Sequence, residues 1–185
     1  MASSAPVDHH KSLSPSAASV RVAIVTASDS RTPDTNEGGR VLRRLVEEAG
    51  FAVTSDDLLA EEQDALRDAV ARRAREADVV IVTGGTGIGP RDRTPDAVGA
   101  LFDRRLPGFG ELFRMLSFQE IGPSAMLSRA DAGVVGGALV FLLPGSPAAV
   151  DLAVRRLIAP ELTHAVGQLR RGGAHHHGRG HHHER

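Results

Sequence analysis

Residues Asp78 to Asp96 read DVVIVTGGTGIGPRDRTPD, and this stretch joins an apolar run to a glycine-rich loop and a helix start. Residues 78–83 are mostly β-branched and bounded by polar residues, which predicts a strand covered on both faces in a parallel sheet. Thr94 and Pro95 predict the N-cap and the first residue of a helix. Ligands of doubly wound sheets lie beyond the carboxyl ends of strands. The loop is therefore a predicted binding site.

The glycines of this loop permit positive φ angles and let a ligand approach the main chain closely. They are Gly84, Gly85, Gly87 and Gly89. The loop is not a P-loop, which needs lysine and a hydroxyl residue after its last glycine, because Pro90 and Arg91 stand there. It also fails the dinucleotide fingerprint, because Pro90 takes the place of the third glycine.

Three other residues make the loop a candidate phosphate site. Thr86 lies at its centre, Arg91 supplies a cation, and Asp92 supplies a carboxylate that could hold Mg²⁺ on a bound phosphate. The competing interpretation is that Asp92 only caps a turn. Ser28 and Asp29 follow the first predicted strand, so they would face the same side as the loop if the two strands are parallel.

Composition narrows the class of protein. The 185 residues suit one domain, and the absence of cysteine excludes disulfides, thiolate metal sites and cysteine nucleophiles. It also fits a reducing compartment, so we expect a cytoplasmic protein. A net charge of -1 argues against nucleic-acid binding. The longest apolar runs are too short to cross a bilayer, and no signal peptide is visible.

The distribution of lysine and histidine excludes two catalytic classes. Lys11 is the single lysine and lies in the polar N-terminal segment, which argues against lysine-based covalent catalysis in the core. His164 is the only histidine outside the terminal segments. Because it falls late in a predicted helix and no nucleophile elbow is present, a Ser-His-Asp hydrolase is disfavoured.

The two ends differ in composition from the rest of the chain. Residues 1–19 are rich in serine, alanine and proline and predict a disordered arm, and residues 171–185 predict a disordered tail. The domain is expected over residues 20–170. The histidine-rich tail could bind zinc, copper or nickel. We interpret it as an adventitious metal binder or an expression tag and exclude it from the active site.

Before the loop, hydrophobic periodicity predicts alternating strands and helices. Strands are expected at residues 20–28 and 51–59, and helices at about 34–49 and 62–76. Asp34 and Glu37 predict a capping box for the first helix. Gly38 and Gly39 weaken that helix by roughly 1 kcal/mol each relative to alanine, which indicates a close packing contact or a nearby ligand, with a frayed first turn as the alternative.

After the loop, a helix is expected from Pro95 to about Phe102. Residues 106–110 contain a proline and two glycines and predict a turn, followed by a short helix over residues 111–118. Residues 132–135 and 138–143, joined by two glycines, predict a β-hairpin. Ser146 and Pro147 then predict the start of a helix over 148–158, and a last helix is expected at 161–169.

Three motifs resemble the MoaB and Mog family of molybdenum-cofactor biosynthesis proteins. They are GGTGIGPRDRTPDA, LPGFGELFRMLSFQEIGPSAMLSRADAG and FLLPGSPAAV, in this order and spacing. The resemblance covers residues 20–170. It implies a three-layer α/β/α sandwich with a mostly parallel sheet and an antiparallel hairpin, usually assembled as a homotrimer or homohexamer.

The resemblance also implies an activity. Active relatives are molybdopterin adenylyltransferases, in which the terminal phosphate of molybdopterin attacks the α-phosphorus of Mg-ATP and pyrophosphate leaves. Adenylyl-molybdopterin is later consumed by molybdate insertion, so a hand-over to a molybdate-insertion protein is implied. Phosphoryl chemistry needs positioning and charge neutralisation more than a strong base, which this core can supply.

The family's site residues are carried over motif by motif. Gly84, Gly85, Thr86 and Gly87 would hold phosphate groups, and Ser117 and Ser128 match serines linked to pterin or phosphate binding. Ser28, Asp29, Gly145 and Ser146 would surround the nucleotide. Asp92 would be the essential carboxylate acting through Mg²⁺, and Arg91 is the nearest candidate to neutralise developing charge.

One segment departs from the family pattern. Active relatives commonly carry Pro-Asp-Glu or Pro-Asp-Asp where this chain has Ala60, Glu61 and Glu62. Glu61 could still reach Mg²⁺ with its longer side chain, or it could serve only the helix dipole. The alternative function is therefore a molybdopterin-binding or carrier protein of the MoaB branch without turnover.

Overall fold

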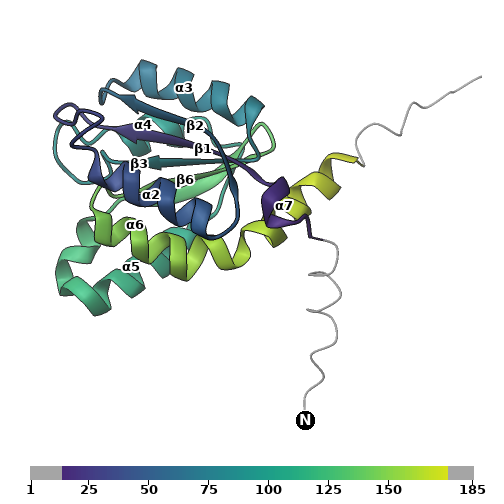
Figure 1. The fold of residues 1–185 in the computed structure, drawn as a ribbon. Coiled ribbons are helices and arrows are strands. Elements are labelled where there is room, and N and C mark those ends of the chain that lie inside the picture. Colours follow the sequence, from purple (N-terminus) through teal and green to yellow (C-terminus); the bar gives the residue numbers. More distant parts are fainter. Residues whose placement is uncertain (1–13, 175–185) are drawn as a thin grey trace, which may run out of the picture.

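The computed structural model describes residues 14–174, and its strands form one sheet in the order β2-β1-β3-β6-β5-β4 (Figure 1). The strands are β1 (Arg21–Ala27), β2 (Ala52–Leu59), β3 (Val79–Thr83), β4 (Arg104–Arg105), β5 (Asp131–Val135) and β6 (Ala138–Leu143). The strands β1, β2, β3 and β6 are parallel, β5 runs antiparallel to β6, and β4 runs antiparallel to β5. The predicted mixed sheet is confirmed.

Helices cover both faces of this sheet (Figure 1). They are η1 (Ala17–Ser19), α2 (Glu37–Glu48), α3 (Gln63–Glu76), α4 (Thr94–Gly99), α5 (Pro107–Ile121), η2 (Gly122–Leu127), α6 (Pro147–Ala153), the π-helical turn η3 (Val154–Ile158) and α7 (Ala159–Ala174). Side chains of α2, α5, α6 and α7 pack on one face, and those of α3 and α4 pack on the other. The chain is a three-layer α/β/α sandwich, as predicted.

The central strand β3 shows why these residues choose this fold. All five of its residues are buried. Val79 and Ile81 join the core beneath α2 and α6, and Val80 and Val82 join the core beneath α3. Since successive side chains of a strand point to opposite faces, only a run that is apolar throughout suits a strand covered on both sides.

The predicted hairpin is also confirmed. Gly136 and Gly137 have φ angles of 56° and 97°, and they connect β5 to β6 in an antiparallel pair. Positive φ at both central residues gives the turn whose twist matches the flanking strands. This hairpin places β6 beside β3, so the chain after β6 emerges next to the glycine loop.

The predicted capping box on α2 is wrong. The helix begins at Glu37, and its N-cap is Asn36. The Asn36 side chain accepts a hydrogen bond from the Gly39 N–H (3.0 Å) and donates one to Thr26 Oγ1 (3.0 Å). A Cβ atom on Gly39 would lie 2.2 Å from the Asn36 amide nitrogen, so this glycine serves close packing, one of the expected explanations.

The predicted turn at residues 106–110 is wrong as well. Pro107 instead occupies the first position of α5, where its missing N–H costs no helical hydrogen bond. Gly110 lies inside the helix, where an added Cβ atom would come within 2.7 Å of the Ala130 carbonyl oxygen. The glycine therefore allows α5 to approach the chain near β5, and it does not break the helix.

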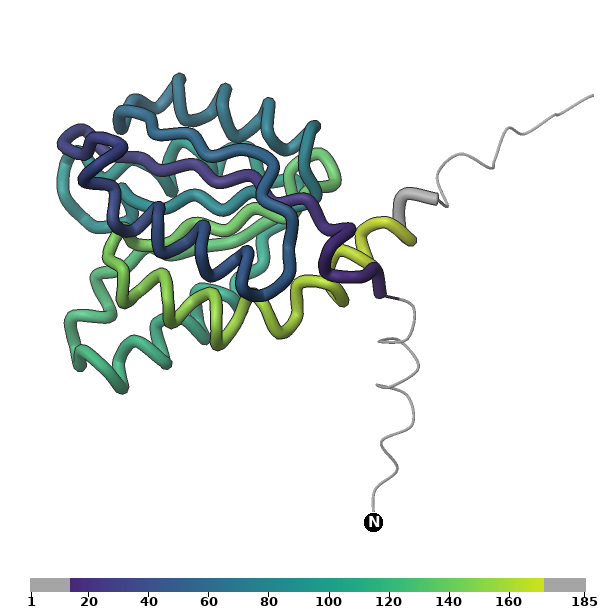
Figure 2. Tube along the Cα trace, viewed as in Figure 1, coloured from purple at the N-terminus to yellow at the C-terminus, as the bar shows by residue number. Residues whose placement is uncertain are grey.

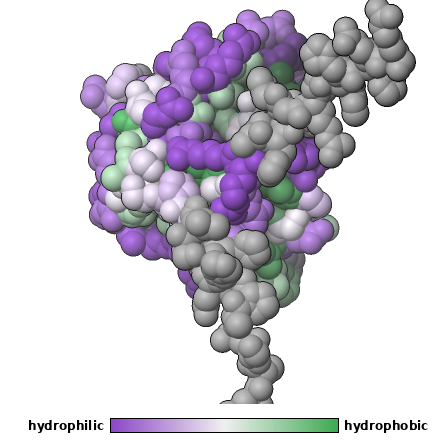
Figure 3. All heavy atoms as spheres, turned by 90° about the vertical axis from the view of Figure 1, so that its right-hand side faces the viewer, coloured by the Kyte–Doolittle hydropathy of each residue, from purple (hydrophilic) through white to green (hydrophobic). Residues whose placement is uncertain are grey.

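The two ends of the described chain lie on the same side of the domain, which faces the viewer in Figure 3. Much of the surface visible there is hydrophilic. The segment from Ser14 runs beside α7, and Pro15 and Ser14 approach Gly167 (Figure 2). Structured residues therefore begin before the predicted domain start at residue 20, and α7 extends beyond the predicted end at residue 170. The predicted arm and tail otherwise lie outside the described residues.

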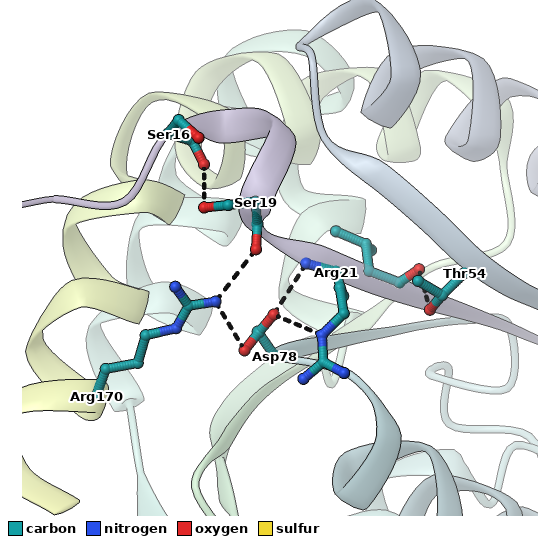
Figure 4. A network of polar contacts seen from close by, with 7 residues as sticks. Ser16, Ser19, Arg21, Thr54, Asp78 and Arg170 are labelled. Carbon is teal, nitrogen blue, oxygen red and sulfur yellow. Dashed lines mark hydrogen bonds and ion pairs between the residues drawn. The ribbon is translucent and has the colours of Figure 1, made fainter.

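A polar cluster fastens this side of the domain (Figure 4). Asp78, just before β3, accepts hydrogen bonds from the Arg21 N–H (3.0 Å) and from Arg21 Nε (3.3 Å). Arg170 on α7 pairs with the same carboxylate (3.0 Å) and donates to the Ser19 carbonyl oxygen (3.2 Å). One partly buried carboxylate thus connects the N-terminal segment, two strands and the last helix.

In the described part of the chain, no helix combines the length and the apolar character that crossing a membrane requires.

Candidate functional site

Three strand ends meet where the glycine loop begins. The Gly84 N–H donates to the Leu143 carbonyl oxygen (2.9 Å), and Thr83 Oγ1 donates to the Pro144 carbonyl oxygen (3.0 Å). Gly84 has a φ angle of 105°, and a Cβ atom there would lie 2.1 Å from the Ala27 carbonyl oxygen. Only glycine fits between the ends of β1 and β6.

The loop that follows presents free backbone donors. Gly85 has a φ angle of 62°, and its carbonyl oxygen accepts the Thr94 N–H (3.1 Å), which closes the loop onto α4. Within residues 14–174, no hydrogen bond uses the N–H groups of four successive residues, which are Gly85, Thr86, Gly87 and Ile88. Successive free N–H groups of this kind suit an anion.

Asp92 closes a turn at the end of this loop. Its Oδ2 atom accepts the Gly89 N–H (2.8 Å), and its own N–H donates to the Gly89 carbonyl oxygen (3.0 Å). Cβ atoms on Gly87 and Gly89 would lie 2.7 and 2.8 Å from Asp92 Oδ2. The turn-capping interpretation is therefore correct for Oδ2, and these glycines make room for the carboxylate.

Asp92 also lines a pocket of about 300 Å³. The residues that line it are Asp29, Ser30, Glu61, Gly89, Pro90, Arg91 and Asp92. The Glu61 N–H donates to Asp29 Oδ1 (2.8 Å), and a Cβ atom on Gly85 would lie 3.1 Å from Glu61 Oε2. The structure thus brings together Asp29, Glu61, Arg91 and Asp92, which sequence reasoning assigned to one site.

The surroundings of the pocket disfavour the ionised form of the Glu61 carboxyl group. Burial raises the pKa of Glu61, the carboxylates of Asp29 and Asp92 raise it further, and the Arg91 guanidinium opposes them. A cation placed among these oxygens would reverse that effect, because opposite charge favours the ionised carboxyl. The donor set therefore suits a hard divalent cation such as Mg²⁺.

The fit to Mg²⁺ rests on few protein ligands. In the part of the chain that the structure describes, no group of three or more His, Cys, Asp or Glu side chains is arranged for a metal ion. Mg²⁺ is commonly bound by one or two carboxylates together with substrate phosphates and waters. Asp92 and Glu61 can supply such a pair. The buried Thr94 Oγ1, which has no hydrogen-bond partner among the described residues, lies beside the same loop at Gly85.

Thr94 differs from its predicted role. It is the first residue of α4, and Arg93 is the N-cap. The Thr94 hydroxyl is directed into the interior beside Gly85, where a Cβ atom would lie 2.5 Å away. The Gly85 carbonyl oxygen satisfies the Thr94 N–H at this end of the helix, and no side chain caps it.

The second strand-to-helix junction lies beside the loop. Gly145 sits against Gly84, because a Cβ atom on Gly145 would lie 3.4 Å from the Gly84 Cα. Ser146 is the N-cap of α6 as predicted, and its Oγ accepts the Ala149 N–H (3.3 Å). The Gly145 carbonyl oxygen accepts a hydrogen bond from Arg31 (3.0 Å), whose own N–H donates to Ser28 Oγ (3.2 Å).

The two serines matched to pterin binding are placed differently. Ser128 follows η2 directly and precedes Arg129, whose N–H donates to the Thr86 carbonyl oxygen (2.8 Å), so Ser128 adjoins the loop. Ser117 is buried on α5, and no hydrogen bond between described residues joins it to the loop. The structure therefore places Ser128 next to the residue that bonds the loop, whereas Ser117 has no hydrogen bond to the loop among the described residues.

Sequence reasoning missed Arg31 and Arg129 as parts of this region. Arg31 connects the end of β1 to the Gly145 junction, and Arg129 contacts the glycine loop at several carbonyl oxygens. Both contacts join residues far apart in the chain. No local pattern signals them, because an arginine in a loop has the same sequence appearance when it is fully solvated.

Fold and site together define a class of protein. The chain is an α/β domain whose parallel strands end at a glycine-rich loop with free N–H groups beside a carboxylate pocket, an arrangement that suits a ligand with phosphate groups. Comparison with known proteins makes this specific. Residues 23–164 match the family model described as a probable molybdopterin binding domain.

Individual relatives agree with the family model. Molybdenum cofactor biosynthesis protein B of Bacillus cereus is 46% identical over 168 residues, which cover 89% of this chain and 98% of the relative. A crystal structure of a molybdenum cofactor biosynthesis protein B has 46% identity and a TM-score of 0.80, and the match covers 85% of this chain and 99% of that one. The molybdopterin biosynthesis enzyme MoaB from Thermus thermophilus has 34% identity and a TM-score of 0.70, over 81% and 96% of the two chains.

The chain belongs to the MoaB family of molybdopterin-binding-domain proteins, and it therefore takes part in molybdenum cofactor biosynthesis.

Proposed function

We propose that this protein transfers AMP from ATP to the terminal phosphate of molybdopterin. A phosphate oxygen of molybdopterin forms a bond to the α-phosphorus, the bond from that phosphorus to the bridging oxygen breaks, and pyrophosphate leaves with the electron pair. The observation that carries the proposal is that the loop segment with four free N–H groups adjoins the pocket lined by Glu61, Arg91 and Asp92, because Gly85 lies beside Glu61 and Gly87 beside Asp92.

Each part of the site has a role in this proposal. The free N–H groups of residues 85–88 bind the phosphate groups, and Arg91 neutralises charge that develops on the α-phosphate. Ser128, beside the loop, contacts the pterin or phosphate part of molybdopterin, and Ser117 is assigned to the same ligand on the family resemblance alone. Four residues that follow β1 and β6 surround the nucleotide, and these are Ser28, Asp29, Gly145 and Ser146.

The carboxylates of Asp92 and Glu61 would hold Mg²⁺. When bound there, Mg²⁺ supplies charge neutralisation and orients the phosphates for in-line displacement. The support for this assignment is that Glu61 is partly buried and lies near Asp29 and Asp92. Burial and these two carboxylates raise the pKa of Glu61, and a divalent cation would offset the repulsion between the carboxylates. Oδ2 of Asp92 already accepts the Gly89 N–H, so the same contact fixes the carboxylate in place.

A second candidate function is molybdopterin binding without turnover. The observation that favours it is the sequence Ala60-Glu61-Glu62, where active relatives carry an aspartate after proline. The side chain of Glu61 is one methylene longer than that of aspartate, so its carboxylate lies at a different distance from the backbone. This function predicts tight molybdopterin binding with no Mg²⁺-dependent consumption of ATP.

The test is pyrophosphate release from ATP with freshly prepared molybdopterin and Mg²⁺, run with wild type and Asp92→Asn. The asparagine keeps an acceptor for the Gly89 N–H but loses the charge, so we expect turnover to fall about 100-fold or more with molybdopterin affinity largely retained. Asp103→Asn is the matched control, because Asp103 Oδ2 accepts the Gly136 N–H (2.8 Å) in a turn at the hairpin.

Wild-type turnover in Asp92→Asn would remove Asp92 from catalysis. Binding of molybdopterin without pyrophosphate release in the wild-type protein would instead support the carrier function. The Asp103→Asn control should match wild type in both measurements, because its turn takes no part in the proposed site.

We further propose that the protein assembles as a homotrimer or homohexamer. The support is a stripe of exposed apolar side chains on α5 that continues into η2. Its members are Leu112, Met115, Phe118, Ile121, Met126 and Leu127. On α5, successive members of this stripe are three residues apart, so each lies next to the one that follows it on the helix surface.

A further inference from the structure

Arg129 reaches from the segment after η2 into the back of the glycine loop. Its Nε donates to the Gly87 carbonyl oxygen (2.7 Å), its own N–H donates to the Thr86 carbonyl oxygen (2.8 Å), and its Nη2 donates to the Asp92 carbonyl oxygen. Its Nη1 pairs with the Asp96 carboxylate at 2.9 Å. One residue therefore contacts the loop at three carbonyl groups.

These contacts account for the free donors on the loop. In a turn of successive N–H groups that bind an anion, the N–H groups and the carbonyl oxygens face different ways. Arg129 occupies the carbonyl oxygens of Thr86 and Gly87, and each of these shares a planar peptide unit with the N–H of the next residue. Those N–H groups, of Gly87 and Ile88, have no acceptor among the described residues. Fixing the carbonyl oxygens therefore fixes the direction of the N–H groups.

We propose that Arg129 is a positioning residue that holds the loop in its phosphate-binding conformation. It contacts main-chain carbonyl groups of the loop and leaves the phosphates to the N–H groups. Because Ser128 is its neighbour in the chain, the same anchor fixes the serine of the pterin side relative to the phosphate loop. This inference rests on the proposed function for the identity of the bound phosphates.

The geometry requires arginine in particular. The guanidinium presents five N–H donors in a planar fork, and here Nε, Nη1 and Nη2 serve three different acceptors on Gly87, Asp96 and Asp92. A lysine carries its charge on one nitrogen at the end of a flexible chain. It restores the charge at this position but cannot reach the two loop carbonyl groups together with Asp96.

The first test measures the loop without any substrate. Amide hydrogen exchange of Gly89 and Thr94 reports the two hydrogen bonds that close the loop. In Arg129→Gln we expect exchange at both amides to be about tenfold faster or more, because charge-assisted hydrogen bonds that restrain the loop are lost. Amides of β3, on the far side of Gly84, should exchange as in wild type, which shows that the fold is retained.

The second test uses the kinetics of pyrophosphate release. Arg129→Gln should raise the KM for molybdopterin about tenfold or more and change kcat less, because the displaced N–H groups bind ground state and transition state alike. Arg129→Lys should recover only part of this loss. Asp96→Asn, which removes the ion pair and leaves the carbonyl contacts, is the matched control and should stay within about twofold of wild type.

The outcomes separate this inference from the proposed function. If wild type releases no pyrophosphate, the proposed function fails, and the exchange rates alone decide the role of Arg129. Unchanged exchange in Arg129→Gln would overturn the inference whether or not the protein turns over. Full recovery by Arg129→Lys, or an equal loss in Asp96→Asn, would also overturn it, because charge or the ion pair would then be sufficient.

Discussion

Two partly buried carboxyl groups lie at opposite ends of the parallel strands, and their surroundings shift their pKa values in opposite directions. Burial and the neighbouring carboxylates of Asp29 and Asp92 raise the pKa of Glu61. Burial alone would raise the pKa of Asp78 too, but hydrogen bonds from the Arg21 N–H and from the Arg170 and Arg21 guanidinium groups outweigh it and lower the pKa.

The opposite directions of the two pKa shifts give the two carboxyl groups opposite effects on stability as the pH changes. Folding favours the protonated form of Glu61, so its contribution to stability is present at low pH and is lost as the pH rises through its raised folded pKa. Asp78 behaves conversely. Its contribution is present above its unfolded pKa of about 3.9 and is lost as the pH falls through the lower folded pKa. We interpret the pocket at Glu61 as a site that a cation completes, and the cluster at Asp78 as complete without one.

The Asp78 cluster yields a stability prediction. Asp78→Asn should lower the free energy of unfolding by about 1 to 3 kcal/mol at pH 7, because charge-assisted hydrogen bonds to Arg21 and Arg170 are weakened. The difference from wild type should shrink as the pH falls through the lowered pKa of Asp78. Urea unfolding over a series of pH values measures it.

The control for this prediction is Asp64→Asn. Asp64 pairs with Arg67 at 3.1 Å, but its side chain is 90% exposed, so the change should cost less than about 1 kcal/mol. An Asp78→Asn deficit that is equally large in acid would mean that packing, and not the ionised carboxylate, holds the cluster together.

At the scale of elements, the site depends on how closely three strand ends approach one another. Gly84 lies against the Ala27 carbonyl oxygen at the end of β1, and Gly145 after β6 lies against Gly84. Asn36 at the start of α2 fastens the same region through Thr26. The glycine loop therefore starts from a tightly packed junction, which suits the proposed reaction, because that reaction depends on positioning.

A pair of glycine substitutions tests this junction. Gly84→Ala should destabilise the protein by about 1 to 3 kcal/mol or more, because φ is 105° and the added Cβ atom would meet the Ala27 carbonyl oxygen. Gly108→Ala is the matched control. Gly108 lies in the first turn of α5 with nothing within 4 Å of an added Cβ atom, so alanine should be neutral or stabilise the helix by up to about 1 kcal/mol.

Thermal unfolding of the two variants measures both effects. Equal stability of Gly84→Ala and wild type would mean that β1 and β6 can separate at this point, and the junction would not be rigid.

Local patterns predict most of the elements because the patterns and the tertiary structure agree. The run at β3 and the double glycine of the hairpin each contain their own structural signal. The start of α5 contradicted its local signal, since Pro107 begins the helix and Gly110 serves a contact with Ala130. Propensity cannot reveal such a contact, because its partner lies 20 residues further along the chain.

In the candidate site, too, residues within one stretch of sequence could be predicted, whereas a contact between distant residues could not. Glycine spacing, Arg91 and Asp92 could be predicted from a single stretch, and the parallel strands correctly placed Asp29 near them. Arg129 could not be predicted, because its contact with Gly87 joins residues 42 positions apart. What it recognises is main-chain carbonyl oxygen, which every residue carries and which leaves no mark in the sequence.

On the scale of the whole molecule, the apolar stripe on α5 and η2 predicts assembly. Phe118 is 58% exposed and Met126 is 76% exposed, which is a large apolar surface for a monomer. We expect sedimentation equilibrium to give three or six times the chain mass of 19.5 kDa. Met115→Glu with Phe118→Glu should lower that mass while circular dichroism stays unchanged. A wild-type monomer at micromolar concentration would contradict the proposed assembly.

The proposed reaction makes a new phosphoanhydride bond between AMP and the terminal phosphate of molybdopterin. The most direct measurement is the mass of the pterin product after incubation of the purified protein with molybdopterin, ATP and Mg²⁺. We predict molybdopterin heavier by one adenylyl group, formed together with pyrophosphate and absent with Asp92→Asn. Molybdopterin that is bound but recovered unchanged, with ATP intact, would contradict the claim and identify the protein as a carrier.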